Sequence, residues 1–292
     1  MSTNYQIFVD STTDLTPALA EQWKLEVIPY IFILDGNEYY NYLDYRQLSV
    51  KEFYDALRAG KTGSTTQVTA HRYMEAWEPF LKEGKDILYM CLSSALSKSF
   101  EQSQLAAKEA METYPDRKVI TIDSKCASMG QGLLAKKAAD ARDEGKTLED
   151  AAAYLENIIP SIHHWVMADD LHHLRRGGRV SGAQAFLGTM LSVKPILTIL
   201  SEGKLTPVHK VRGRGKALDF FVEKMTEVGY NVPDAVFISH SDAPDLANQL
   251  KEMIEKKFGV KEFYINEIGP VIGAHTGPGT IAMMYTAKTP RA

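Results

Sequence analysis

Short apolar runs alternate with longer amphipathic segments along most of this chain. The apolar runs that predict strands in the first half lie at residues 5–9, 25–34, 86–92 and 118–122. This alternation is typical of an α/β protein with a largely parallel sheet, because each connecting helix returns the chain to the same edge. The first half therefore predicts a three-layer domain in which helices cover both faces of a parallel sheet.

Local signals mark where several helices begin and end. Ser49 and Glu52 have the spacing of a capping box, in which each satisfies a free amide of the first turn. Further helices are predicted over 129–145 and 147–159, and Pro160 halts the second because proline cannot continue a helix.

We place a domain boundary at Pro160, which divides the chain into residues 1–160 and 161–292. The second part predicts a helix over 181–192 and a β-rich stretch over 194–211. Three further apolar runs, at 235–241, 262–268 and 280–287, predict strands, and a helix is expected over 242–259. The fold expected is therefore α/β with two domains: an N-terminal parallel-sheet domain and a C-terminal mixed-sheet domain.

Composition narrows the classes of function. The 292 residues carry a formal net charge of −4, so no basic face for nucleic acid is expected. Cys91 and Cys126 are too few for a disulfide framework or a cysteine zinc site. No apolar stretch approaches the roughly 20 residues that span a bilayer, and no signal peptide is recognisable. We expect a cytoplasmic protein.

Familiar catalytic and nucleotide motifs are missing. The segment 210–218 resembles a phosphate loop, but Lys210 and Ala217 stand where the motif needs glycine and a hydroxyl residue. Neither a G-x-G-x-x-G after a strand nor a G-x-S-x-G elbow occurs. The chain is not expected to bind a nucleotide by itself.

Hydroxyl-rich turns follow three of the predicted strands, at 9–15, 92–100 and 123–128. Ligands of parallel α/β sheets bind beyond the carboxyl ends of the strands, so these turns predict an anion or carboxylate site. Ser93 and Ser94 lie at such a strand end, although ordinary helix capping explains them equally well. Residues 63–73 form a further hydroxyl-rich loop that capping alone would explain.

The predicted helix over 181–192 has one apolar face. Its members are spaced by three and four residues, as in a helix packed against a core or lining a lipid: Ala183, Phe186, Leu187, Met190 and Leu191.

Basic residues gather at 175–179 and 204–216, either as solvated faces or as places to dock an acidic partner or a phosphate. The histidine pairs 163–164 and 172–173 invite a metal interpretation. Neighbours on a strand point to opposite faces, however, so a pair does not chelate, and no metal site is expected.

Near the C-terminus, the sequence VIGAHTGPGT (271–280) holds His275 among three glycines. Glycine permits tight turns and close approach of the backbone, which makes this histidine a candidate site residue.

The motifs in this order resemble those of the DegV family of bacterial lipid-binding proteins. The segments that carry the resemblance are FVDSTTDL, STTQVT, LSSALSKSF, IDSKCASMGQG, LRRGGRVSGAQAFLGTMLSVKPIL, KVRGRGKA and IGAHTGPGT. They are spread over almost the whole chain. Two departures stand out: Thr66 and Val68 replace the family's usual serine and proline, and Lys98-Ser99 replaces a common Gly-Thr.

The resemblance implies a carrier that buries one long-chain fatty acid in a tunnel between the two domains. It also implies a separate ATP-binding kinase subunit that phosphorylates the presented carboxylate, so this chain is not expected to be an enzyme or to need a cofactor. Transient contact with a membrane surface is a further expectation. The family's carboxylate contacts fall on Thr65, Ser93, Ser94 and His275, with Thr66 as an alternative to Thr65.

The resemblance also assigns roles outside the head-group site. The arginine for engagement with the kinase falls on Arg212. The apolar face of 181–192 would line the acyl tunnel.

Two alternatives remain from the residues themselves. One is a stand-alone enzyme on a small phosphorylated or carbonyl substrate, which would need a polar cavity. The other is an acyl hydrolase that uses Ser94 with His275 and an orienting acid, either Asp10 or Asp123.

Overall fold

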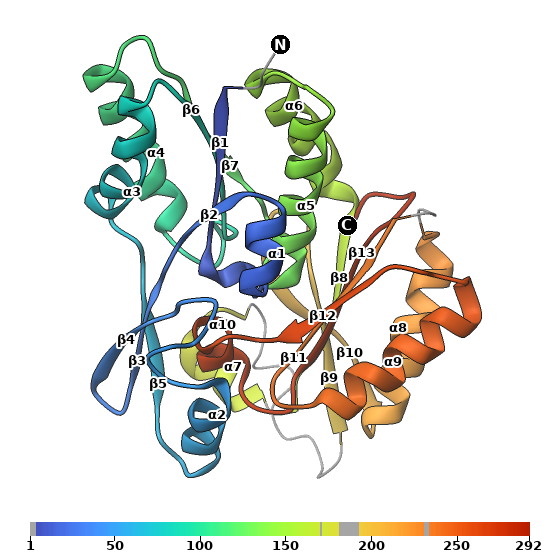
Figure 1. Cartoon of the computed structure of the whole chain (residues 1–292). Coiled ribbons are helices and arrows are strands. Elements are labelled where there is room, and N and C mark those ends of the chain that lie inside the picture. The colour runs from blue at the N-terminus through green and yellow to red at the C-terminus, as the bar shows by residue number, and fades with distance from the viewer. Residues whose placement is uncertain (1–3, 170, 181–192, 231–233) are drawn as a thin grey trace.

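The computed structural model describes residues 4–169, 171–180, 193–230 and 234–292 (Figure 1). Its first sheet has four strands, all parallel, in the order β2-β1-β6-β7. The strands are β1 (Tyr5–Asp10), β2 (Leu25–Ile28), β6 (Asp86–Cys91) and β7 (Val119–Asp123). The predicted parallel sheet is confirmed.

Helices cover both faces of this sheet, as Figure 1 shows. On one face, α1 (Pro17–Gln22), α5 (Met129–Asp143) and α6 (Leu148–Ile158) share a core with the side chains of Ile7 and Val9. On the other face, α3 (Ala70–Lys82) and α4 (Ser99–Thr113) pack around Phe8 and Tyr89. The alternation of side chains along β1 therefore supplies both cores.

The apolar run 25–34 is two strands, so the prediction of a single strand was wrong. After β2, the chain turns at Pro29 and enters β3 (Ile31–Leu34) of a different sheet. Proline has no amide hydrogen to donate, which ends the pairing with β1. Strand β3 pairs antiparallel with β4 (Asn37–Tyr40) and β5 (Gly63–Thr66). The segment expected to be a loop at 63–73 thus begins as a strand.

The second large sheet is mixed, as predicted, with the order β10-β9-β8-β13-β11-β12. Its strands are β8 (Ile162–Met167), β9 (Val193–Ile199), β10 (Leu205–Arg212), β11 (Val236–His240), β12 (Phe263–Glu267) and β13 (Ile281–Thr286). Strands β11 and β12 are parallel and the other pairs are antiparallel. Helices α8 (Arg214–Val228) and α9 (Pro244–Phe258) cover one face.

Helix α5 lies between the two large sheets. It contacts β1 and β6 of the parallel sheet and β8, β11 and β13 of the mixed sheet. The side chains of Leu133 and Leu134 belong to one continuous core with Met90 and Met284. The division at Pro160, which lies in a short 3₁₀ turn just before β8, stays a prediction.

Three shorter helices complete the part of the chain that concerns the site: α2 (Val50–Arg58), α7 (Leu171–Gly177) and α10 (Pro270–Thr276). The helix predicted over 181–192 lies outside the described residues. None of the described helices is long and apolar enough to cross a membrane.

Candidate functional site

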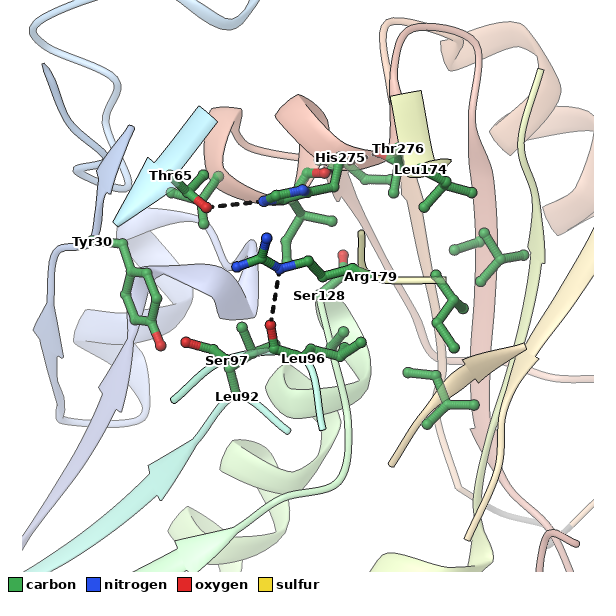
Figure 2. A pocket seen from close by; sticks show the side chains of 18 of the residues that line it. Tyr30, Thr65, Leu92, Leu96, Ser97, Ser128, Leu174, Arg179, His275 and Thr276 are labelled. Atoms are coloured by element: carbon green, nitrogen blue, oxygen red, sulfur yellow. Dashed lines mark hydrogen bonds between the residues drawn. The ribbon is translucent and has the colours of Figure 1, made fainter. Parts of the chain in front are cut away.

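A cavity of about 270 Å³ lies between the two large sheets, beyond the carboxyl ends of the parallel strands (Figure 2). The loops after β6 and β7, strand β5 and helix α10 wall it on one side, and β8, β9 and β13 on the other. Much of its lining is aliphatic: Leu92, Leu96, Val166, Leu174, Ile199, Ile272, Ala282 and Met284. The cavity therefore suits an apolar ligand far better than a small polar one.

Polar side chains also line the cavity, and two of them form a pair. Thr65 Oγ1 lies 2.9 Å from His275 Nε2, and both side chains line the cavity (Figure 2). Thr65 comes from β5 and His275 from α10, more than two hundred residues later in the chain. Thr66 also lines the cavity, but the hydrogen bond to the imidazole belongs to Thr65.

The imidazole of His275 is neutral at pH 7. Its pKa is lowered to about 4, mainly by burial and in addition by the nearby charges of Arg179 and Arg176. Its Nδ1 is buried and has no hydrogen-bond partner among the described residues. A Cβ atom on Gly177 would lie 2.2 Å from Nδ1, so the glycine of α7 is what lets this ring fit.

Arg179 brings a positive charge to the same wall. Its guanidinium donates to the Gly177 carbonyl at 2.6 Å and to the Leu96 carbonyl at 3.3 Å. Figure 2 shows it between His275 and the loop that carries Leu96. The sequence indicated a basic cluster at 175–179, and the structure brings this member of it to the cavity.

Ser93 and Ser94 bond to other groups. The Ser93 hydroxyl is buried and donates to the Gly203 carbonyl at 2.8 Å. The Ser94 hydroxyl donates to Asp123 Oδ2 at 2.6 Å. Neither serine is among the residues that line the cavity, whereas Thr65 and His275 are.

The third serine of the same loop, Ser97, lines the cavity and was missed from the sequence. Its hydroxyl lies 3.0 Å from that of Ser99, which accepts from the Val68 amide. The serine-rich segment LSSALSKS indicated that a hydroxyl of this loop could reach a ligand. Which serine faces the cavity depends on the path of the loop in the folded chain.

Tyr30 was also missed. It follows the break at Pro29, lines the cavity, and keeps its buried hydroxyl without a hydrogen-bond partner among the described residues. The sequence predicted one strand over 25–34, in which Tyr30 would be an ordinary strand residue. Tyr30 lines the cavity because the chain breaks at Pro29.

The remaining predicted site residues are Arg212 and the apolar face of 181–192. Arg212 ends β10, is exposed, and is not among the residues that line the cavity. Ala183, Phe186, Leu187, Met190 and Leu191 lie outside the described residues.

The histidine pairs differ in setting. His163 and His164 lie on β8 as expected, and His163 Nε2 is 2.9 Å from the Thr289 carbonyl oxygen. The pair 172–173 lies on helix α7, so treating it as a strand was wrong. Among the described residues, no group of three histidine, cysteine or acidic side chains is placed to hold a metal ion.

The three hydroxyl-rich turns do meet at the edge of the parallel sheet, after β1, β6 and β7. The buried carboxyl of Asp10 links two of the strands, since it accepts from the Thr12 amide at 2.9 Å and the Leu92 amide at 3.1 Å. Burial raises the pKa of Asp10 despite these bonds. This carboxyl is thus a structural group that aligns the turns.

Fold and site together define the class: an α/β protein with a largely apolar cavity between a parallel and a mixed sheet, lined at one place by a hydroxyl–imidazole pair. The chain belongs to the DegV family, because the family model described as "Uncharacterised protein, DegV family" matches residues 4–288. The DegV domain-containing protein CPE0026 of Clostridium perfringens is 37% identical over 286 residues, which cover 98% of each chain.

Solved structures agree over the whole length. The fatty acid-binding DegV family protein of Thermus thermophilus is 28% identical, with a TM-score of 0.89 over 98% of this chain and 100% of that one. DegV of Bacillus subtilis, described as a fatty acid binding protein, is 29% identical, with a TM-score of 0.82 over 98% and 100%.

Proposed function

We propose that this protein binds one long-chain fatty acid in the cavity between its sheets and presents the carboxylate to a separate ATP-binding kinase subunit. Thr65 and His275, with Ser97 beside them, are the groups we assign to the carboxylate. Residues 183–191 would line the remainder of the acyl tunnel. The protein would act in the cytoplasm as a carrier.

The observation that carries this proposal is the hydroxyl–imidazole pair of Thr65 and His275 in a cavity whose surface is mostly apolar. A fatty acid has the same distribution of polarity, one carboxylate on an apolar chain. Each buried methylene contributes about 0.8 kcal/mol, so a long chain alone would be held firmly. The relatives of Thermus thermophilus and Bacillus subtilis, both fatty acid-binding proteins, support the same ligand class.

Local electrostatics support the head-group assignment. A neutral imidazole and a threonine hydroxyl can donate hydrogen bonds to a carboxylate without burying a second full charge. The guanidinium of Arg179 adds a positive charge at the wall, where it favours an anion. For Ser93 and Ser94 a carboxylate contact would require exchange of their bonds to Gly203 and Asp123.

The proposed kinase step rests on the resemblance of the motifs and on the lack of a nucleotide-binding motif in the sequence. No nucleotide motif occurs in the sequence, so phosphate would have to come from a partner. We assign Arg212 to that partner's docking surface because it is exposed at the end of β10.

The hydrolase alternative finds less support. Ser94 bonds to Asp123, while His275 bonds to Thr65, so serine and histidine are not paired as nucleophile and base. The aliphatic lining likewise argues against a small polar substrate.

Mass spectrometry of an organic extract from the purified protein tests the proposal. We expect one equivalent of long-chain fatty acid, and much less in His275→Ala, because the carboxylate loses a partner. His71→Ala is the matched control, since His71 is exposed on α3 and pairs with Glu75 of the same helix. A clean extract, with no uptake of added oleic acid, would refute the proposal.

A further inference from the structure

Asp14 is a buried acid that the proposed function does not use. It ends the turn after β1, is 1% exposed, and has a positive φ of 52°. Only glycine, asparagine and aspartate adopt that conformation readily, which explains an acid or amide at this position. Burial raises the pKa of its carboxyl to about 8.

The carboxyl of Asp14 contacts two segments that reach the cavity and, through Ser128, a third segment, strand β11. Oδ1 accepts from the amide of Gly269, the residue that caps α10, at 2.9 Å. Oδ2 lies 2.5 Å from the hydroxyl of Ser128, which lines the cavity at the start of α5. Ser128 in turn lies 2.9 Å from the Ser239 hydroxyl on β11.

This chain of hydroxyls accommodates a protonated acid. In the structure the Ser128 hydroxyl donates to Oδ2. Because a hydroxyl can rotate, a protonated Oδ2 would instead donate to Ser128 and Ser128 onward to Ser239, while Oδ1 still accepts from Gly269. Ionisation would force both hydroxyls to reverse.

The surroundings favour the neutral form. The titratable groups that face Asp14 in the described part of the chain are Asp10, Tyr45 and Tyr54, and all are acids. The charge of Glu267 acts on the two tyrosines and not on Asp14. The Asn41 carbonyl oxygen lies against Gly269 beside Oδ1 and has no hydrogen-bond partner among the described residues. A negative charge here would have the Gly269 amide and the Ser128 hydroxyl as donors, but no base among the titratable groups just named.

We propose that Asp14 is a positioning residue: as a neutral carboxylic acid it fastens the start of α10 to the end of β1, and its ionisation loosens α10 and releases the ligand. Helix α10 carries His275 together with Val271 and Ile272 of the cavity wall. Only the ligand part of this inference rests on the proposed function.

The test is release of carboxyl-labelled oleic acid from the loaded protein into excess phosphatidylcholine vesicles, followed from pH 6 to 9.5. If opening exposes Asp14, the release rate of the wild type rises by up to about tenfold per pH unit and levels off near pH 8. Asp14→Asn keeps the amide contacts and the backbone conformation but cannot ionise, so its rate should not change with pH.

Glu267→Gln is the matched control. Burial also raises the pKa of Glu267, which lies at the end of β12 and is not part of the contact with α10. This variant should keep the pH dependence of the wild type. An equal pH dependence in Asp14→Asn, or its loss in Glu267→Gln, would overturn the inference.

Urea unfolding without ligand separates this inference from the proposed function. The native state keeps a proton that the unfolded chain has lost between about pH 4 and 8, so stability falls as the pH rises through that window. The unfolding constant of the wild type, relative to that of Asp14→Asn, should rise with pH and level off near pH 8. Parallel curves would overturn the role of Asp14, whereas failure to load oleic acid would refute only the proposed function.

Should Asp14→Asn not fold, carbon-13 labelling of the aspartate carboxyls in the wild type gives the answer. A carboxyl signal that titrates near pH 8 supports the inference. Complete ionisation of every aspartate by pH 6 would overturn it.

Discussion

The imidazole of His275 is held from two sides. Thr65 bonds to its Nε2, while the bare Cα of Gly177 leaves room for its Nδ1. Its position therefore depends as much on an absent side chain as on a hydrogen bond.

Gly177→Ala should displace the imidazole. The new Cβ would lie 2.2 Å from Nδ1, far inside normal contact distance, so the ring or α7 must move. We expect the variant to fold but to retain far less fatty acid in an organic extract. Gly215→Ala on α8 is the control, because nothing lies within 4 Å of its added Cβ, and alanine should stabilise that helix by up to about 1 kcal/mol. Full retention in Gly177→Ala would contradict this account of the site.

Two of the three residues assigned to the carboxylate were predictable from the sequence. Thr65 and His275 were predicted from the resemblance of their motifs, and the structure brings them within hydrogen-bond distance. Ser97 could not be separated from Ser93 and Ser94 in one serine-rich loop, because only the path of that loop decides which hydroxyl faces the cavity.

Helix α10 is too short to be stable by itself and depends on its anchors. Besides Asp14 on Gly269, the buried Tyr54 hydroxyl donates to the Ile268 carbonyl at 2.7 Å. Gly273 packs directly on this hydroxyl, where a Cβ would lie 2.5 Å away. The helix that carries His275 is thus fixed to α2 and β1 by polar contacts at its start.

Tyr54→Phe should weaken the attachment of helix α10 to α2. It leaves the buried Ile268 carbonyl without its donor, which costs about 0.5–1.5 kcal/mol of unfolding free energy, measured in urea. Fatty acid should also be released faster into vesicles. Tyr114→Phe is the control: this hydroxyl, at the end of α4, donates to Glu78 of α3, and its loss should leave release unchanged. Equal release from both variants would argue against Tyr54 as an anchor.

Element boundaries show how far local patterns extend. The capping box of Ser49 and Glu52 is present, and α5 and α6 lie where their periodicity predicted. The prediction of a single strand over 25–34 was wrong because the apolar pattern is the same for one long strand and for two short strands in different sheets. Its break at Pro29 is what places Tyr30 in the cavity.

Across the whole molecule, helix α5 serves both sheets at once. Its apolar residues lie in one core with strands from each half of the chain, and the cavity takes its walls from both. Removal of either half would expose this core to water.

Unfolding in urea should therefore be a single cooperative transition, by tryptophan fluorescence and by circular dichroism alike. Trp77 reports on the parallel-sheet half and Trp165 on the mixed-sheet half. Oleic acid, if it binds only the native state, should shift the midpoint upward. Two separated transitions would instead show that the halves divided at Pro160 are independent in stability.

Periodicity and local chemistry were enough to predict the parallel and mixed sheets, the hydroxyl-rich turns and the candidate histidine. Other features emerge only when the chain is folded: which hydroxyls meet the cavity, where the apolar run 25–34 breaks, and the burial of Asp14 against Gly269. These depend on contacts between residues that are far apart in the chain, and burial, which sets the protonation of His275 and Asp14, exists only once those contacts form.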